Sequence, residues 1–315
     1  MHDKITIVIA TYNRTEFLTE TIDSLLNQSY LPVEIIIVND GSEERYNEDL
    51  ESIVRISSLI KRIDLGKNFG VSHARNIGTK HANGDYILYL DDDDTLHQDM
   101  LEKCIQTFNK YPKVDVVMTG GEILNKNLNR LSHREKHVSL NTNRHLNLLH
   151  KESNSTLYFI LFGMGLIHSF LFKKKVLLKY PFDEKLKIGE DTYQWLLLKS
   201  KGVNFRKIEL CGAYYRLHAN QISNKESNDN SKKDYLIKAL QIINGDFEKQ
   251  IFEIMNNSLL ADAGISAQKN SCQLFIQSPF TFIYLKIFML ENKVERNILF
   301  LSNLLKSAIK SSPNK

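Results

Sequence analysis

Residues 5–14 read ITIVIATYNR, a run of apolar and β-branched residues that gives way to polar ones. A continuous run of this kind is typical of a strand buried on both faces of a parallel sheet. Apolar residues then recur at helical spacing through TEFLTETIDSLLNQ, residues 15–28, which predicts a helix. The chain therefore opens with a strand, a polar turn and a helix, the first part of a βαβ unit.

The same alternation continues along the chain and predicts an α/β fold. VEIIIV (33–38) predicts a second buried strand, closed by the turn-forming NDGS. Further strands are expected at 59–65, 85–90 and 114–120, and helices at 71–80 and 99–110. This order favours an open, mostly parallel sheet with helices on both faces, in which ligands bind beyond the carboxyl ends of the strands. The polar clusters TYNR, NDGS and DDDD all follow predicted strands, so we expect them at one edge of the sheet.

Four consecutive carboxylates, Asp91 to Asp94, follow the predicted strand at 85–90. Like charges this close repel, so they must be solvated, paired or neutralised. One interpretation is a solvated loop or a helix N-cap, with Asp94 capping the following helix. The other is that Asp91 and Asp93, alternate residues of an extended segment, share a divalent cation. Oxygen ligands without a nearby cysteine favour Mg²⁺ or Mn²⁺ over zinc, and such ions also bind substrate phosphates.

The composition limits the class of protein. A chain of 315 residues, 25% of them charged, is expected to form one large domain or a domain with an extension. The net charge of +4 gives nucleic-acid binding little support. The three cysteines include no C-x-x-C pair, which fits a reducing compartment. We see neither a secretion signal nor a bilayer-spanning apolar run, and therefore expect a cytoplasmic protein.

Six segments in this order carry a family resemblance: IVIATYNR, EIIIVNDGS, GVSHARNIG, ANGDYILYLDDDD, FDEKLKIGEDTYQWLLL and YYRLHANQIS. From about residue 4 to residue 223 the chain resembles the inverting nucleotide-sugar glycosyltransferases of family 2. The resemblance implies a GT-A fold, an open and mostly parallel twisted sheet flanked by helices, as a catalytic domain at 1–223. It also implies Mn²⁺- or Mg²⁺-dependent transfer of a hexosyl or N-acetylhexosaminyl group. The expected donor is a UDP-sugar, and the expected acceptor is a hydroxyl of a glycan or glycolipid in bacterial-type surface polysaccharide synthesis.

The resemblance assigns residues of the first half of the chain to the nucleotide sugar. Asp40 matches a base-binding position, and a carboxylate suits this task because uracil presents a ring N–H; Tyr12 can cover the base face. Arg75 meets a phosphate or braces the acidic run, two roles that the sequence leaves open. In the matching Asp-x-Asp motif, Asp93 is the expected direct metal ligand. The expected nucleotide-sugar residues are Ala10, Thr11, Tyr12, Asp40, Arg75, Asp91 and Asp92, and the expected metal ligands are Asp93, Asp91 and His218.

The downstream motifs supply the expected general base. By match to the family's Glu-Asp pair, Asp191 is the base, and Glu190 binds the acceptor or orients the loop. The alternative for both is a favourable interaction with a helix N-terminus. Trp195 is either a stacking floor for an acceptor sugar or a core residue, and Arg216 is a candidate phosphate contact.

The C-terminal part of the chain differs in character. Residues 224–315 predict a helical extension after a polar linker, and the stretch around His133 to His150 predicts a variable loop beside the acceptor. The segment 279–315 is basic and amphipathic, so it either touches an anionic membrane surface from the cytoplasmic side or packs on the catalytic domain or a second subunit.

Two other functions stay open at this stage. The first is a catalytically inactive nucleotide- or glycan-binding module of GT-A fold, although such a module has no chemical need for Asp40, Asp91, Asp93, Asp191 and His218 together. The second is a sugar nucleotidyltransferase, which would need a glycine-rich basic loop after the first strand; ATYNRTE contains no glycine.

Overall fold

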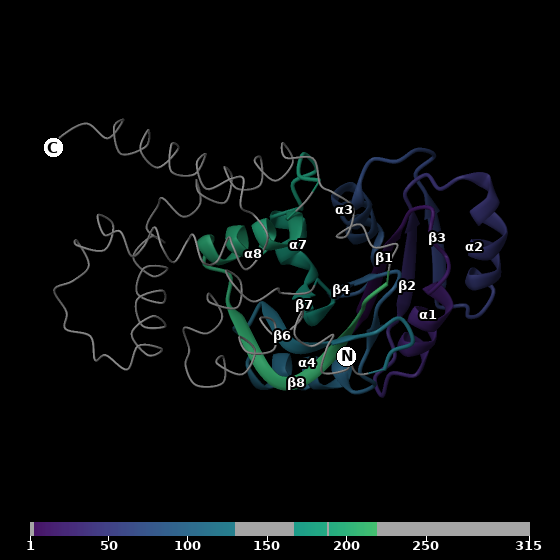
Figure 1. Ribbon diagram of the computed structural model, residues 1–315. Helices are drawn as coiled ribbons and strands as arrows, with labels where there is room; N and C mark the ends of the chain where they lie inside the picture. Colours follow the sequence, from purple (N-terminus) through teal and green to yellow (C-terminus); the bar gives the residue numbers. More distant parts are fainter. Residues whose placement is uncertain (1–2, 130–166, 188, 219–315) are drawn as a thin grey trace, which may run out of the picture. The chain divides into compact units, whose positions relative to one another are not determined.

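The computed structural model describes residues 3–129, 167–187 and 189–218 (Figure 1). The expected domain boundary at 223, the helical extension at 224–315 and the histidine-containing stretch at 133–150 lie outside the described residues. Within the described part, each helix is too short or too polar to cross a membrane.

Strands and helices alternate as the sequence predicts. The strands are β1 (Ile5–Thr11), β2 (Glu34–Asn39), β3 (Ile60–Asp64), β4 (Tyr86–Asp91), β5 (Thr95–Leu96), β6 (Val116–Leu124), β7 (Phe170–Lys173) and β8 (Phe205–Arg216). The helices are α1 (Leu18–Leu26), α2 (Asn47–Val54), α3 (Val71–His81), α4 (Met100–Lys110), α7 (Lys174–Lys179) and α8 (Glu190–Ser200), with short 3₁₀ turns η1 (Glu44–Tyr46) and η2 (Ile167–Ser169).

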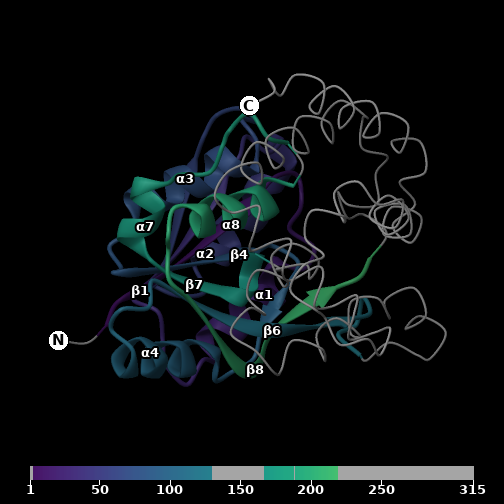
Figure 2. The same ribbon diagram turned by 90° about the vertical axis from the view of Figure 1, so that its left-hand side faces the viewer.

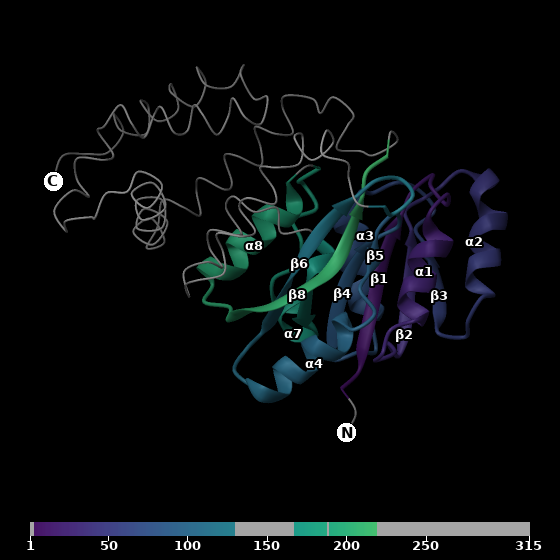
Figure 3. The ribbon, with the colours of Figure 1, turned by 60° about the horizontal axis from the view of Figure 1, so that its bottom comes forward.

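The described strands form one open sheet in the order β3-β2-β1-β4-β7-β6-β8-β5. Strands β3, β2, β1 and β4 are parallel, as their continuous apolar runs predict. The second half is mixed, because β7 runs antiparallel to both β4 and β6, and β5 runs antiparallel to β8. The long, curved β8 lies parallel beside β6 (Figure 3). The expected open sheet flanked by helices is confirmed.

Alternate residues of β1 face opposite layers of helices. Ile5, Ile7 and Ile9 join the core that α1, α2 and α4 cover. Val8 faces the other layer, where Gly78 of α3 lies so close that a Cβ on it would sit 2.3 Å from Val8 Cγ1. Figure 2 shows α3, α7 and α8 on one side of the sheet and α4 on the other. Both faces of β1 are therefore buried, which explains why its sequence lacks an apolar–polar alternation.

The carboxyl ends of three neighbouring parallel strands meet at one edge. In the register, Thr11 of β1 lies opposite Asn39 of β2, and Ala10 lies opposite Asp91 of β4. The segments that follow these strands are TYNR, NDGS and the acidic run. Their predicted convergence at one edge of the sheet is confirmed.

At the opposite edge, Glu34 ties together the starts of several strands. Its carboxylate, 2% exposed, accepts hydrogen bonds from Thr6 Oγ1 at 2.8 Å and from Asn83 Nδ2 at 2.8 Å, and it pairs with Lys61. Burial alone would raise the pKa of Glu34, but the backbone N–H of Asn83, the Lys61 ammonium and Thr6 together lower it from 4.5 to about 2. The ionised form is therefore the one that stabilises the fold.

Replacing Glu34 by glutamine is expected to lower the free energy of unfolding at pH 7 by about 2–3 kcal/mol, because a depressed carboxylate pKa is a stability contribution. That contribution is fully present above the unfolded pKa near 4.5 and is lost as the pH falls toward 2. Urea unfolding of both proteins from pH 7 to pH 3 measures it, with the exposed Glu51→Gln change as control. A stability difference that stays constant with pH would contradict the assignment.

Candidate active site

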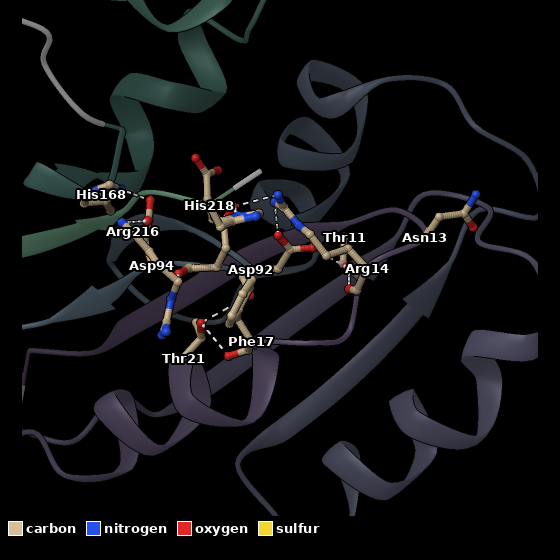
Figure 4. A network of polar contacts seen from close by, with 12 residues as sticks. Thr11, Asn13, Arg14, Phe17, Thr21, Asp92, Asp94, His168, Arg216 and His218 are labelled. Carbon is tan, nitrogen blue, oxygen red and sulfur yellow. Dashed lines mark hydrogen bonds and ion pairs between the residues drawn. The ribbon is translucent and has the colours of Figure 1, made fainter. Parts of the chain in front are cut away.

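The four carboxylates of the acidic run diverge, and each pairs with a cationic side chain or an imidazole. Asp91 is 2.9 Å from Arg75, and Asp94 is 3.0 Å from Nδ1 of His168. Asp92 and Asp93 share the guanidinium of Arg14. Figure 4 shows Arg14 beside Asp92. The mutual repulsion expected from the sequence is thus offset by pairing inside the protein.

Arg14 is the counter-ion of the two middle carboxylates. Its NH2 group pairs with Asp92 Oδ1, and its NH1 group lies 2.6 Å from Asp93 Oδ2. Thr11 Oγ1 also donates to Asp92 at 2.6 Å, and His218 Nε2 lies 2.9 Å from Asp93 Oδ2. Burial raises the pKa of both carboxyls to about 6, against the opposing effect of Arg14. These carboxylates consequently favour a cation beside them.

The expectation that Asp94 caps the following helix is wrong. Helix α4 begins at Met100, and its N-cap residue is Asp99. Asp94 instead is fully buried and accepts a hydrogen bond from the backbone N–H of Arg216 at 2.8 Å. The short strand β5 separates it from the helix, so its role is to join the acidic run to the end of β8.

Asp91, Asp94 and His168 form a group whose ligand atoms all lie within 4.8 Å of one another. His168 and Asp94 are buried, and the ring nitrogens of His168 have no hydrogen-bond partner of normal geometry. Burial lowers the pKa of His168, but the neighbouring Asp94 carboxylate raises it more. Two carboxylates and an imidazole are a donor set that suits Mn²⁺. The structure thus groups Asp91 with Asp94 and His168, whereas the other two expected metal ligands, Asp93 and His218, contact each other.

The polar segments after β1 and β2 hold the expected nucleotide residues. Tyr12 is 46% exposed, so its ring is available to a ligand. Asp40 is buried, and its two oxygens accept the backbone N–H groups of Phe69 and Gly70, each at 2.8 Å. Asp40 therefore also fixes the segment that begins α3, a function that the sequence did not indicate.

Arg75 of α3 bridges the acidic run and the start of α8. Its NH2 lies 2.9 Å from Asp91 Oδ1, and its NH1 lies 2.9 Å from Glu190 Oε1. Burial lowers the pKa of Arg75, but Asp91, Glu190 and Asp191 raise it more. The sequence left two roles open for Arg75, a phosphate contact and an ion pair that braces the acidic run. The structure shows the ion pair.

Glu190 and Asp191 lie in the first turn of α8, directly after Gly189, whose φ of +70° is the left-handed conformation that glycine adopts without strain. Burial and the neighbouring Asp191 raise the pKa of Glu190 to about 7, against the pull of Arg75. Glu190 therefore keeps its proton more readily than an exposed glutamate does, beside a second carboxylate.

Asn76 fixes the segment that leads to this pair. Its Nδ2 donates to the carbonyl of Phe182 at 3.0 Å and to Glu184 Oε1 at 2.9 Å, while its Oδ1 accepts the N–H of Phe182 at 2.9 Å. One buried amide thus satisfies both backbone groups of Phe182.

Replacing Asn76 by alanine is expected to lower the free energy of unfolding by about 2 kcal/mol, because the N–H and carbonyl of buried Phe182 lose their partner. Urea denaturation measures the difference. The exposed Asn109, which donates to Asp3 at 3.2 Å, provides the matched control Asn109→Ala. Equal stability of the two variants would show that the Phe182 contacts are not limiting.

Two other expected site residues are core residues. Trp195 is fully buried and stacks on Phe170 and Phe172, with ring centroids 4.5 and 5.1 Å apart. It has no exposed face for a sugar, so the core alternative holds. Arg216 is also buried; it donates to the carbonyls of Asp93 and Lys126, at 2.8 and 2.7 Å, instead of facing a phosphate.

Two residues of the site were missed by sequence reasoning: Arg14 and His168. The match of the ARN segment placed Asn76 near the nucleotide, whereas the structure shows Asn76 holding the backbone of Phe182. Arg14 stands inside a quoted motif, TYNR, so its position directly after the end of β1 is the signal that could have found it. His168 has no such signal, because its partner Asp94 is 74 residues away and no spacing rule connects them.

Comparison with known proteins gives the class. The model of glycosyl transferase family 2 matches residues 6–179, more than half of the chain. Two solved structures share the fold, with low sequence identity. S. aureus TarS in complex with UDP-GlcNAc has a TM-score of 0.62 and 18% identity, over 78% of this chain and 69% of that one. GalNAc-T7 with UDP, GalNAc and Mn²⁺ has a TM-score of 0.56 and 14% identity, over 78% and 49%. Fold and site together define a glycosyltransferase domain of GT-A type.

The chain belongs to glycosyl transferase family 2. A glucosyl-dolichyl phosphate glucuronosyltransferase of Haloferax volcanii is 32% identical over 38% of this chain and 38% of its own length. Glycosyltransferase GlyA of Streptococcus pneumoniae is 34% identical over 35% of this chain and 16% of its own. An uncharacterized glycosyltransferase of Haemophilus influenzae is 27% identical over 73% and 71%. The match thus spans less than half the length of the first two relatives.

Proposed function

We propose that this protein is a metal-dependent inverting glycosyltransferase that moves a sugar from a UDP-sugar to an acceptor hydroxyl. The observation that carries the proposal is the bridge through Arg75, which joins the acidic run on β4 to the Glu190–Asp191 pair on α8. Such a transfer needs a cation-binding donor side and a carboxylate base on the acceptor side, held at a fixed spacing. One buried guanidinium provides that spacing.

The donor side consists of the segments after β1, β2 and β4. Exposed Tyr12 offers a face on which the base stacks. Asp40 directly follows β2, and its backbone N–H donates to the carbonyl of Thr11 at 2.9 Å. Ala10, Thr11, Asp91 and Asp92 complete the proposed nucleotide-sugar site. The complexes of TarS with UDP and with UDP-GlcNAc support UDP as the nucleotide.

A divalent cation, Mn²⁺ or Mg²⁺, fits the donor set. Asp93 Oδ2 and His218 Nε2 are 2.9 Å apart, close enough to bind one ion together, and Asp91 lies at the same strand end. The Asp91, Asp94 and His168 group is the second position. The Mn²⁺ in GalNAc-T7 supports the choice of metal. When bound, the ion offsets the negative charge that grows on the departing diphosphate.

On the acceptor side, we propose Asp191 as the general base. The acceptor oxygen attacks the anomeric carbon from the side opposite the diphosphate; the new carbon–oxygen bond forms as the bond to the phosphate oxygen breaks. The hydroxyl proton passes to the Asp191 carboxylate, and the electron pair leaves with UDP. Glu190, held by Arg75 and with a pKa of about 7, orients the loop or donates a hydrogen bond to the acceptor.

The acceptor that we propose is a glycan or a lipid-linked glycan of surface polysaccharide synthesis, presented on the cytoplasmic side of a membrane. The basic amphipathic segment 279–315 supports this choice. Liposome flotation with and without that segment tests it. Recovery with anionic vesicles is expected only for the full chain, and equal recovery would overturn the membrane contact.

The function itself is tested with nucleotide sugars and Mn²⁺. At a ligand concentration of 100 Kd, UDP-GlcNAc or UDP-glucose is expected to stabilise the fold by about 2.7 kcal/mol, visible as a thermal shift. GDP-mannose should give no shift, and mass spectrometry should detect transfer to added glycan acceptors. A shift with GDP-sugars alone would overturn the UDP assignment. Binding of UDP-sugars without transfer or hydrolysis would favour the inactive binding module.

A further inference from the structure

Arg14 occupies the place beside Asp93 where a divalent cation would bind. Its NH1 lies 2.6 Å from Asp93 Oδ2, the same oxygen that lies 2.9 Å from His218 Nε2. We propose that Arg14 is a built-in counter-ion that the cation displaces from Asp93 and that then contacts the diphosphate. The inference rests on the proposed function and adds to it a residue that controls when the donor site is loaded.

The backbone fixes where Arg14 starts. Asn13 adopts a left-handed conformation, with φ of +51°, which asparagine tolerates better than most residues. Its N–H donates to Ser42 Oγ at 2.9 Å, and its Oδ1 accepts the N–H of Glu43 at 2.8 Å. The turn after β1 is thereby tied to the segment after β2. It directs the side chain of Arg14 back over the acidic run (Figure 4).

The side chain of Arg14 is more accessible to solvent than the two carboxylates that it pairs with. Its exposed fraction is 21%, against 1% and 6% for Asp92 and Asp93. The two carboxylates that Arg14 contacts also differ in their other hydrogen-bond partners. Asp92 Oδ2 is taken by Thr11 Oγ1, so Asp92 has a second partner that does not depend on Arg14. Asp93 Oδ2 is instead shared by Arg14 and His218, and a metal ion bound to both Asp93 and His218 would meet the NH1 group.

The charges of the metal ion and of Arg14 predict which of the two stays beside Asp93. A divalent cation interacts more strongly with a buried carboxylate than a guanidinium does, because its charge is twice as large and is concentrated on a small ion. Arg14 then keeps its NH2 bond to Asp92 and swings its free NH1 edge away from Asp93. A guanidinium placed beside the cation pairs naturally with phosphate oxygens through its planar fork. Arg14 therefore opposes the metal alone and favours the metal together with the nucleotide diphosphate.

Two titrations of the full chain separate these effects. Mn²⁺ alone, followed by electron paramagnetic resonance, is expected to bind Arg14→Gln at least about tenfold more tightly than the wild type, because the competing charge is gone. UDP at saturating Mn²⁺, followed by calorimetry, is expected to bind Arg14→Gln about tenfold more weakly. Arg14→Lys, which keeps the charge without the fork, should bind Mn²⁺ like the wild type and UDP more weakly.

The control is Arg62→Gln. Arg62 is also mostly buried and pairs with Asp64 at 2.7 Å, on β3, and its removal should change neither titration. Unchanged or weaker Mn²⁺ binding by Arg14→Gln would overturn the competition, and unchanged UDP affinity would overturn the diphosphate contact. Circular dichroism spectra matching the wild type would show that the variant is folded. A wild-type protein that binds neither Mn²⁺ nor UDP would instead contradict the proposed function.

Discussion

Replacing Asp191 by asparagine is expected to lower the turnover number by about 10²- to 10⁴-fold, the usual contribution of a positioned general base. The amide keeps the size of the carboxylate but cannot accept the hydroxyl proton. Because Asp191 lies on α8 and the proposed nucleotide residues follow β1, β2 and β4, UDP affinity should stay within about twofold of the wild type. Initial rates at saturating donor and acceptor, with UDP calorimetry, measure both quantities.

A carboxylate at a helix N-terminus stabilises the helix even when it takes no part in catalysis. A control variant separates this effect from the loss of a general base. Asp99 is the N-cap residue of α4 and makes no side-chain cap hydrogen bond. Asp99→Asn removes a similar charge from a similar place, so its turnover should match the wild type. If Asp191→Asn retained more than half of the turnover, the interaction with the helix N-terminus would suffice to explain Asp191, and the base assignment would fail.

Replacing Arg75 by glutamine is expected to lower the free energy of unfolding by about 3–5 kcal/mol, since it leaves two carboxylates without their buried partner. Its guanidinium is 5% exposed and lies 2.9 Å from both Asp91 and Glu190. Urea denaturation measures the loss. The double variant Arg75→Gln with Glu190→Gln should recover part of it, because the neutral amide no longer needs a cation.

The exposed pair of Arg55 and Glu51, 3.3 Å apart, supplies the control. Arg55→Gln should change stability by less than about 1 kcal/mol, as exposed ion pairs do. An Arg75→Gln protein as stable as Arg55→Gln would mean that water or another cation replaces the bridge. In that case, Arg75 would have the phosphate role that its sequence position also allows.

The part of the fold that depends on local sequence was predictable. Continuous apolar runs such as ITIVIA and VEIIIV can only be covered on both faces, and the polar segments after them must then lie at one edge. The mixed second half was not predictable in the same way. β5 has two residues and pairs with β8, more than 100 residues later, so neither its existence nor its partner is visible in a local pattern.

The same division applies to the site. The positions of Asp91 and Asp93 follow from a strand end, and the family resemblance points to Asp191 and His218. The partners of the acidic run do not follow from either. Asp92 meets Arg14 across 78 positions of sequence, and Asp94 meets His168 instead of the helix that local capping preference favoured. Burial decides these pairings, because a carboxylate removed from water needs whichever cation the fold brings closest.

Helix α3 connects the segments that follow β2 and β4 to the start of α8. Asp40 holds the two residues before the helix, Phe69 and Gly70. The middle of the helix carries Arg75 and Asn76, and at Gly78 it packs directly against Val8 of β1. In the proposed reaction, contacts from this one helix therefore set the distance between the acidic run and the Glu190–Asp191 pair. A substitution that shifts α3 is therefore expected to change the relation between the proposed donor and acceptor sides, even where it contacts neither substrate.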